Sequence, residues 1–382
     1  METARTINSH SERLYFIDRL RIFGIASIFT FHCMRFFDSY NWHVKNTDTS
    51  LVANIFVEFT ILWIMPLFFV ISGVGTWFSL RPDKTGKFLF ARVKRLMIPF
   101  MLGVFTITPP QVYLERLTGG QFTGTFFDFI PHYFDGWYGF EGNFAWMGLH
   151  LWYLLALFIY SIIMLPVFLF MKSRLSDLLS KIAGSVTKTV VLLMTFAISL
   201  IILEVLLEQH WLGMRDFGGW NLIAYIIYYL FGVTIASNSE FFRTLEKLAI
   251  IAFMPAIVIT FGAFAYILSG GEIRGLFEAV IRVSISGSII IVLLGFGRRF
   301  LDGEPRYLNI LNEAVLPFYI LHQFVIIIVG YFVVQTSLSI LLKFIVISAL
   351  SLSVILSLFI FAIRPFNTVR FLFGMKLRKK EI

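Results

Sequence analysis

Two ionisable residues in the first long apolar run are spaced so that a helix would carry both on one face. Arg21 and His32 are 11 residues apart, which corresponds to about 16.5 Å of helical rise and about 1100° of turn. Asp18 and Arg35 lie near the same face, so the helix would present a polar stripe. A histidine can act as a general base on a hydroxyl group near neutral pH. The alternative is structural, with Arg21 as an interfacial anchor and His32 as a satisfied histidine between helices.

Other apolar runs also contain ionisable residues, which are costly in a membrane and are functional candidates by default. Glu58 is about two helical turns below the outer end of its run, roughly level with His32, and a carboxylate there could orient a histidine. His150 lies at the outer mouth of another run, and His322 lies near the middle of a third. Each could equally make an interfacial contact or a hydrogen bond between helices.

Three charged residues recur at a spacing of four within one apolar run: Arg274, Glu278 and Arg282. This spacing places them on one helix face, where they could pair along the helix. They would either line a polar cavity or simply neutralise one another. The candidates for a substrate channel are therefore Arg35, His150, Arg274, Glu278, Arg282 and His322.

Several classes of enzyme have characteristic sequence motifs that this sequence lacks. It has no glycine-rich phosphate loop, dinucleotide fingerprint, His-Glu-x-x-His or Gly-x-Ser-x-Gly motif, which disfavours ATP hydrolysis, metal hydrolysis and a serine nucleophile. The single cysteine, Cys33, excludes an intrachain disulfide and a cysteine-built metal site. We expect Cys33 to serve packing, because neighbours on a helix point about 100° apart. No metal or bound prosthetic group is implied.

The elements that position these residues must be membrane helices. The chain has 382 residues, of which 58% are hydrophobic and 14% charged, and its mean hydropathy is +0.81; a soluble domain carries about 25% charge. A helix that crosses a bilayer needs about 20 mostly apolar residues. We therefore predict an all-α, polytopic membrane helix bundle of about ten transmembrane helices, forming a single integral-membrane domain over residues 1–382. The predicted spans are 17–38, 52–79, 97–112, 147–171, 189–209, 220–237, 248–269, 275–297, 313–335 and 338–363.

Basic residues set the predicted orientation, because Lys and Arg in short loops stay on the cytoplasmic side. Most of the 32 basic residues fall at the N-terminus, which includes Arg5 and Arg13, in alternate loops, and in a short tail, 364–382. Both termini are therefore expected in the cytoplasm. The net charge of +9 then reflects topology rather than binding to nucleic acid.

Six short segments then suggest a family. In chain order they are YFIDRLRIFGIASIFTFH, NWHV, MPLFFVISG, ARVKRLMIP, HLWYLLAL and PFYILHQ. In this combination the chain resembles the membrane-bound acyltransferase 3 family, and in particular its branch of periplasmic glucan-modifying succinyltransferases. The resemblance extends from the first predicted helix to the ninth, so it covers nearly the whole chain.

This resemblance implies a reaction and a location. It implies transfer of an acyl group, such as succinyl or acetyl, from cytoplasmic acyl-CoA to a carbohydrate hydroxyl on the outer side of a bacterial cytoplasmic (inner) membrane. The partners would be the lipid bilayer, acyl-CoA as the donor substrate and a glycan acceptor. His32 matches the family's essential histidine, and Arg21, Arg92 and Arg95 match its conserved basic positions.

The implied site has a donor end and a base. Guanidinium groups at the cytoplasmic rim, such as Arg92 and Arg95, can fork onto the phosphates of CoA, although the retention of basic residues on the cytoplasmic side would explain them equally well. Arg21 is the third residue expected to bind acyl-CoA. His32 would act as the general base, with Glu58 as the acid that orients it. Many family members carry an acid directly before the segment equivalent to LFFVISG, where this chain has Ile64-Met65-Pro66. Glu58 would therefore act from one or two turns away.

The longest segment between apolar runs, 113–146, is expected on the outer side. Its many aromatic residues, among them Trp137, argue against disorder and are interleaved with acids such as Asp128 and Asp135. Flat aromatic faces pack on sugar rings and carboxylates accept hydrogen bonds from hydroxyl groups, so this segment could bind the acceptor. An aromatic belt at the membrane surface would have a similar composition.

The competing class of function is a transporter or exporter of a small solute or glycan precursor. Ten spans with intramembrane charges would suit a solute pathway. Such folds normally show related repeats and paired broken helices, and neither is visible in this sequence. The oligomeric state is left open by the sequence.

Overall fold

The computed structural model describes residues 14–303 and 307–378, and it confirms the all-α prediction. These residues form no strand and contain only an isolated bridge between Trp137 and Phe144. Arg5, Arg13 and the end of the predicted tail, 379–382, lie outside the described residues. The α-helices in chain order are α1 (Tyr15–Met34), α2 (Leu51–Ser79), α3 (Thr85–Arg92), α4 (Ile98–Leu102), α5 (Pro109–Thr118), α6 (Phe126–His132), α7 (Trp152–Ile163), α8 (Leu165–Arg174), α9 (Ser176–Ala183), α10 (Val186–Leu207), α11 (Leu222–Ile235), α12 (Ser239–Leu268), α13 (Gly275–Leu301), α14 (Leu308–Val334), α15 (Ile340–Ser357) and α16 (Asn367–Leu372).

Six helices of the described chain are long and apolar enough to cross a bilayer: α2, α10, α12, α13, α14, and α15 with its continuation to Ile363. The number becomes seven if Leu149–Ile163 and Leu165–Arg174, which meet at a 51° bend, form one broken span. Leu222–Ala236 is a shorter apolar helix. Every one of the ten predicted ranges overlaps a helical segment, although several extend past its ends. Ten spans and two cytoplasmic termini nevertheless remain predictions.

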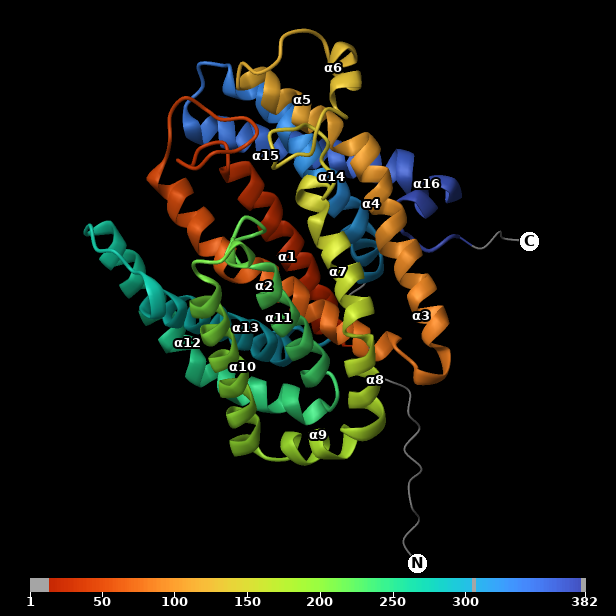
Figure 1. Cartoon of the computed structure of the whole chain (residues 1–382), viewed down its shortest axis with the longest axis vertical. Helices are drawn as coiled ribbons and strands as arrows, with labels where there is room; N and C mark the ends of the chain where they lie inside the picture. Colours follow the sequence, from red (N-terminus) through yellow and green to blue (C-terminus); the bar gives the residue numbers. More distant parts are fainter. Residues whose placement is uncertain (1–13, 304–306, 379–382) are drawn as a thin grey trace, which may run out of the picture.

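α1, the helix that carries Arg21 and His32, lies inside the bundle. It packs against α2, α13 and α14, and Figure 1 shows it near the middle of the molecule. α2 and α14 are themselves mostly buried, whereas α10, α12 and α15 leave most of their apolar residues exposed. Exposed apolar faces of this extent suit contact with lipid rather than water. The polar face of α1 is therefore enclosed by other helices.

A proline inside α2 ties that helix to the segment before α11. Pro66 has no N–H group, so the carbonyl of Leu62 loses its usual helical donor. The buried indole of Trp220 supplies a replacement, with its Nε1 3.1 Å from the Leu62 carbonyl oxygen. An indole N–H needs a partner when it is buried, so this hydrogen bond satisfies two groups at once.

Two glycines let α2 and α11 approach backbone to backbone. Gly73 of α2 faces the backbone of α11, and Gly232 of α11 faces the backbone of Val70. A Cβ atom built on Gly232 would overlap the Val70 carbonyl group. This close contact fixes the position of α2 relative to α11.

The chain between Thr85 and Ile107 is a helical rod interrupted by two π-helical turns, Val93–Met97 and Gly103–Ile107. π turns within helices are frequent at functional sites. The first turn carries Arg95, and α3 ends on Arg92 immediately before it. Two of the three arginines predicted to bind the donor therefore lie at a break in helical regularity.

The predicted outer segment, 113–146, is folded around a small core that it forms together with the preceding residue, Val112. This core consists of Val112, Phe129, Tyr133 and Ala145. Figure 1 shows α5 and α6 at one end of the molecule and α9 at the opposite end. The aromatic residues thus order the segment, as their number predicts.

We expect Gly232→Ala to lower the stability of the protein, because its new methyl group would overlap the Val70 backbone. Overpacking of this kind costs about 1–3 kcal/mol. Thermal unfolding of the purified protein in detergent measures the effect. Gly262→Ala in α12 is the control, since nothing lies within 4 Å of a Cβ at that position. Equal unfolding temperatures for the two variants would contradict the close contact.

Candidate functional site

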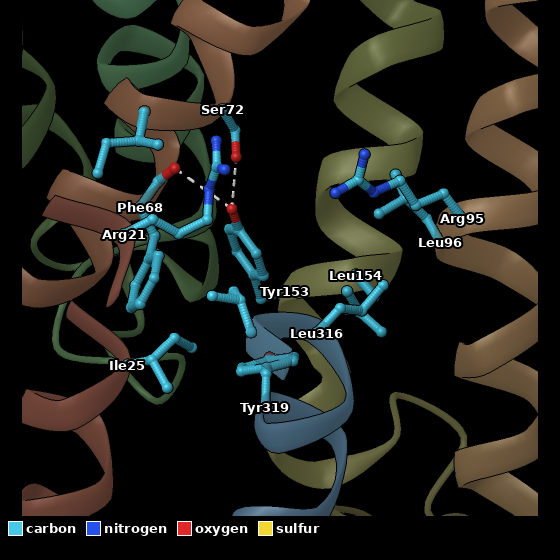
Figure 2. Close-up of a pocket in the computed structure, with 12 residues that line it drawn as sticks. Arg21, Ile25, Phe68, Ser72, Arg95, Leu96, Tyr153, Leu154, Leu316 and Tyr319 are labelled. Atoms are coloured by element: carbon cyan, nitrogen blue, oxygen red, sulfur yellow. Dashed lines mark hydrogen bonds between the residues drawn. The ribbon is translucent and has the colours of Figure 1, made fainter. Parts of the chain in front are cut away.

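A cleft lies where the polar face of α1 meets α2, α7, α14 and the π turn Val93–Met97. It holds about 590 Å³ of space that no protein atom fills, part of it open to solvent. Its polar lining residues are Arg21, Ser72, Arg95, Tyr153 and Tyr319, and its other walls are apolar. Figure 2 shows Arg21 and Arg95 approaching this space from opposite sides. Two cations beside apolar walls suit a long ligand with an anionic end.

The three arginines predicted for donor binding lie close together. Arg21 pairs with Asp18 of its own helix at 3.0 Å, and Arg92 donates to the Thr76 hydroxyl at 2.6 Å. Arg95 has both other arginines as electrostatic neighbours. In the part of the chain that is described, no carboxylate forms an ion pair with Arg92 or Arg95. This end of the cleft is therefore positively charged.

Hydroxyl groups continue the polar lining from the arginines. The Ser72 and Tyr153 hydroxyl oxygens are 2.6 Å apart, and Tyr153 also donates to the Phe68 carbonyl oxygen at 3.2 Å, as the dashed lines in Figure 2 mark. The ring centroids of Tyr153 and Tyr319 are 5.9 Å apart. Tyr319 donates its hydroxyl hydrogen to the backbone carbonyl of His150. Tyr319 thus links the cleft to a group of histidines.

The three predicted histidines, from three separate helical segments, meet beside Tyr319. The His322 ring centroid lies 5.0 Å from that of His32 and 5.1 Å from that of His150. The exposed fractions are 8% for His32, 8% for His150 and 0% for His322. His322 donates through Nδ1 to the Tyr319 carbonyl at 2.6 Å, and His150 donates through Nε2 to the Ile320 carbonyl at 3.0 Å. We call these three residues the histidine cluster.

A second polar layer covers the histidine cluster. The Trp42 ring stacks on His32, with centroids 5.8 Å apart and 19° between the ring planes. The next residue, His43, contacts the carboxylate of Glu115 through Nδ1. Its Nε2 lies 3.2 Å from the amide nitrogen of Gln323. NWHV, one of the segments that carries the family resemblance, therefore lies directly against His32.

Glu115 is held in its ionised form. Burial raises the pKa of this carboxyl group, but hydrogen bonds with His43 and Tyr138 and the charge of Arg116 outweigh burial, so the pKa lies below its usual value. The Tyr138 hydroxyl donates to the Glu115 carboxylate at 2.8 Å. Sequence reasoning did not identify the contact between Glu115 and His43, because residues 72 positions apart share no local pattern.

Two predicted site residues, Glu58 and Arg35, bind side chains of the loop between α1 and α2. Glu58 accepts a hydrogen bond from the Tyr40 hydroxyl, and Arg35 pairs with Asp38 at 2.6 Å. Since its carboxylate reaches this loop, Glu58 is not brought to His32 as the expected orienting acid. The His32 ring instead contacts the rings of Trp42 and His322.

The three charges predicted along α13 do not pair with one another. Each has a partner outside the set: Arg274 pairs with Glu272, Glu278 pairs with Arg215, and Arg282 donates to the Gly219 carbonyl oxygen. Arg215 also pairs at 2.9 Å with Glu204, an acid of α10 that is 3% exposed. None of these residues lines the cleft. Glu204 was missed, although an acid inside an apolar run is the signal that identified the others.

The acceptor candidates of the outer segment have different environments. Asp128 belongs to the capping box of α6, in which the N–H and hydroxyl groups of the N-cap residue Thr125 donate to its carboxylate at 2.9 and 2.7 Å. Asp135 pairs with His132 at 2.8 Å. Trp137 is 58% exposed, so its ring is free to contact a sugar or a lipid headgroup. Binding of the acceptor here stays a prediction.

The arrangement unites two chemical capacities in one connected region. The arginine end can bind phosphate groups, and the histidine cluster can accept protons from a hydroxyl group. No set of three His, Cys, Asp or Glu side chains within residues 14–303 and 307–378 has the spacing of a metal site. The geometry therefore suits transfer of a group from an anionic carrier to a hydroxyl.

Comparisons with known proteins find relatives along most of the chain. The model of the family described as acyltransferase domain (acyltransferase 3) matches residues 14–362. "Glucans biosynthesis protein C" of Escherichia coli strain K12 is 24% identical over 328 residues, and the protein of that name from strain UTI89 is 24% identical over 331 residues. Each match covers 82% of this chain and 82% of the relative. No solved structure matches the chain.

We expect Glu115→Gln to lower the free energy of unfolding near neutral pH by about 1.5–3 kcal/mol, the range for hydrogen bonds to a charged group. Because the folded-state pKa of Glu115 lies below the ordinary value of 4.5, its stabilising effect is complete above that pH and is lost as pH falls through the lowered pKa. Thermal unfolding at neutral and acidic pH tests this.

The control for this prediction is Glu141→Gln in the same segment, where the carboxylate is exposed and the change should have little effect at either pH. The decrease in the free energy of unfolding caused by Glu115→Gln should be smaller at acidic pH. A loss of equal size at both pH values would show that Glu115 does not act through its charge.

Proposed function

The chain belongs to the acyltransferase domain family, and on that premise we propose that it transfers an acyl group from acyl-CoA to a hydroxyl group of a glycan. The family makes the chain an acyltransferase, and its apolar helices indicate a multi-pass membrane protein. The name of the relatives, Glucans biosynthesis protein C, supports a glucan as the acceptor. Succinyl-CoA and acetyl-CoA are the donors that the proposal favours.

One observation carries the proposal: a path of contacts through Tyr153 and Tyr319 connects the arginine end of the cleft to the histidine cluster. The path runs from Arg21 and Arg95 to Tyr153, from there to Tyr319 and on to the histidines. Polar groups inside a bundle are costly unless they are used or paired. A ligand with a charged head and a long thin arm could place its head at the arginines and extend its arm toward the histidine cluster.

At the donor end, the proposal assigns the CoA phosphates to Arg21, Arg92 and Arg95. Planar guanidinium groups bind phosphate oxygens in pairs, and Arg92 and Arg95 have no carboxylate partner among the described residues. The pantetheine arm would lie along the apolar walls of the cleft. This arrangement brings the thioester toward Tyr319 and the histidines.

At the acceptor end, His32 would act as the general base. It takes the proton of the acceptor hydroxyl while the oxygen attacks the thioester carbonyl carbon. The new C–O bond forms and the C–S bond breaks, and the CoA thiolate then takes up a proton. Since Glu58 is bonded to Tyr40, the proposal relies on the neighbouring histidines rather than on Glu58 to orient His32.

The proposed location is a bacterial inner membrane, with the donor in the cytoplasm and the acceptor on the outer side. The competing transporter function would normally bring two related broken helices. The part of the chain that is described has one bent pair, α7 with α8. This observation favours the enzyme over the transporter.

We expect His32→Ala to reduce acyl transfer by at least the 10²–10⁴-fold typical of a lost general base, while the protein still inserts and folds. The assay is transfer of labelled succinyl or acetyl from its CoA ester to glucan by the purified protein in lipid. Cys33→Ala is the neighbouring control, since the Cys33 thiol is buried and serves packing. It should retain transfer, and full activity in His32→Ala would refute the base assignment.

We expect Arg92→Gln and Arg95→Gln to raise the KM for acyl-CoA by about 10–100-fold, as loss of a charge-assisted hydrogen bond implies, with the acceptor KM unchanged. Lys87→Gln on exposed α3 removes the same charge from the same surface and should leave the donor KM near its original value. An equal change in all three variants would mean that general surface charge, rather than a phosphate site, attracts the donor.

A further inference from the structure

Each residue of the histidine cluster has a buried ring nitrogen without a hydrogen-bond partner among the described residues. These atoms are Nδ1 of His32, Nδ1 of His150 and Nε2 of His322. A buried polar atom without a partner costs about 1–3 kcal/mol, so three on adjacent rings form an unusual concentration. A buried group of this kind calls for an explanation, and a ligand that completes its hydrogen bond is one.

The backbone fixes the chemical character of two of these nitrogens. His322 Nδ1 faces the Tyr319 carbonyl and His150 Nε2 faces the Ile320 carbonyl, and a carbonyl only accepts hydrogen bonds. The proton of each neutral imidazole must therefore lie on the bonded nitrogen. The free nitrogens, His322 Nε2 and His150 Nδ1, consequently present lone pairs, and the missing partners must be hydrogen-bond donors.

The chain before α7 is strained to hold His150 in this position. Leu149, the preceding residue, has φ of 50°, and Gly148 has φ of 76°. A bulky residue other than glycine rarely adopts a positive φ, and such strain concentrates at functional sites. The His150 backbone carbonyl is also bonded by Tyr319. The position of the ring is thus fixed from both sides.

The lone pairs of His322 Nε2 and His150 Nδ1 lie beside His32, and neighbouring hydroxyl groups on one sugar ring could donate hydrogen bonds to both of them. The hydroxyl that is acylated donates its proton to His32, and adjacent hydroxyl groups have hydrogens left to donate. A single alcohol could satisfy one lone pair only, whereas a vicinal diol or triol satisfies the set. The stacked Trp42 ring above His32 offers the kind of flat face that packs on a sugar.

We propose that the histidine cluster is the binding site for vicinal hydroxyl groups of the acceptor, in which His150 and His322 accept hydrogen bonds from the hydroxyls next to the one that His32 deprotonates. This inference rests on the proposed function and names the acceptor chemistry at the same site. The two residues bind and orient the acceptor, and the acyl transfer itself balances as described above: one C–O bond forms, one C–S bond breaks, and the hydroxyl proton passes through His32 to the thiolate.

The test uses the full-length protein in lipid with methyl glucoside and its monodeoxy derivatives as acceptors. The wild type should use at least one monodeoxy derivative about tenfold less well in kcat/KM, as one lost hydrogen bond implies. His150→Phe and His322→Phe should each lower kcat/KM for the parent glucoside. Each variant should also use one of the deoxy derivatives as well as it uses the parent, because the hydrogen bond that distinguished them is gone. His210→Phe, in an exposed turn, is the matched control and should discriminate as the wild type does. Unchanged discrimination in both cluster variants would overturn the proposal.

A second measurement uses the wild-type protein alone, so it needs no acyl donor and does not depend on whether a variant folds. In protein labelled with ¹⁵N-histidine, NMR should show His322 protonated on Nδ1 and His150 on Nε2. Adding methyl glucoside without acyl-CoA should shift the signals of their unprotonated nitrogens, and an absence of any shift would contradict the proposal. If the shift occurs while no donor supports acyl transfer in the wild type, the acceptor site stands and the proposed acyl transfer fails.

Discussion

The structure depends most on the joint between the start of α7 and the middle of α14. Tyr319 donates to the backbone carbonyl of His150, and His150 returns a hydrogen bond from its ring to the Ile320 carbonyl. This reciprocal contact lies where Tyr319 lines the cleft and also touches the histidines. α1 carries Arg21 and His32 on one helix, and this contact adds His150 and His322 to that arrangement.

The rest of the bundle can be understood as support for that joint. α1 is enclosed by α2, α13 and α14, so its arginine and histidine face the joint rather than lipid. α2 is fixed in turn through Trp220 and by the glycine contact with α11. The charges of α10 and α13 form a separate cluster around Arg215, where each acid has a cation. None of these charges lines the cleft, whereas the three histidines with unpartnered ring nitrogens meet at the proposed site.

Sequence periodicity predicted relations within one helix well and relations between helices poorly. Arg21 and His32 share a face of α1, as the spacing of 11 residues indicated, because helical geometry alone sets that relation. Glu58 seemed level with His32 by depth, but depth does not fix direction, and its carboxylate turns to Tyr40. The approach of His150 and His322 to His32 depends on packing of helices far apart in sequence. Local spacing carries no information about such contacts.

The central claim is that the path from the arginines to the histidine cluster carries an acyl group from one side of the membrane to the other. Sealed proteoliposomes with glucan trapped inside and labelled acyl-CoA supplied only outside test it most directly, with insertion of the basic face outward verified by protease. The account predicts that label appears on the enclosed glucan. Label on glucan only when donor and glucan share one compartment would contradict it.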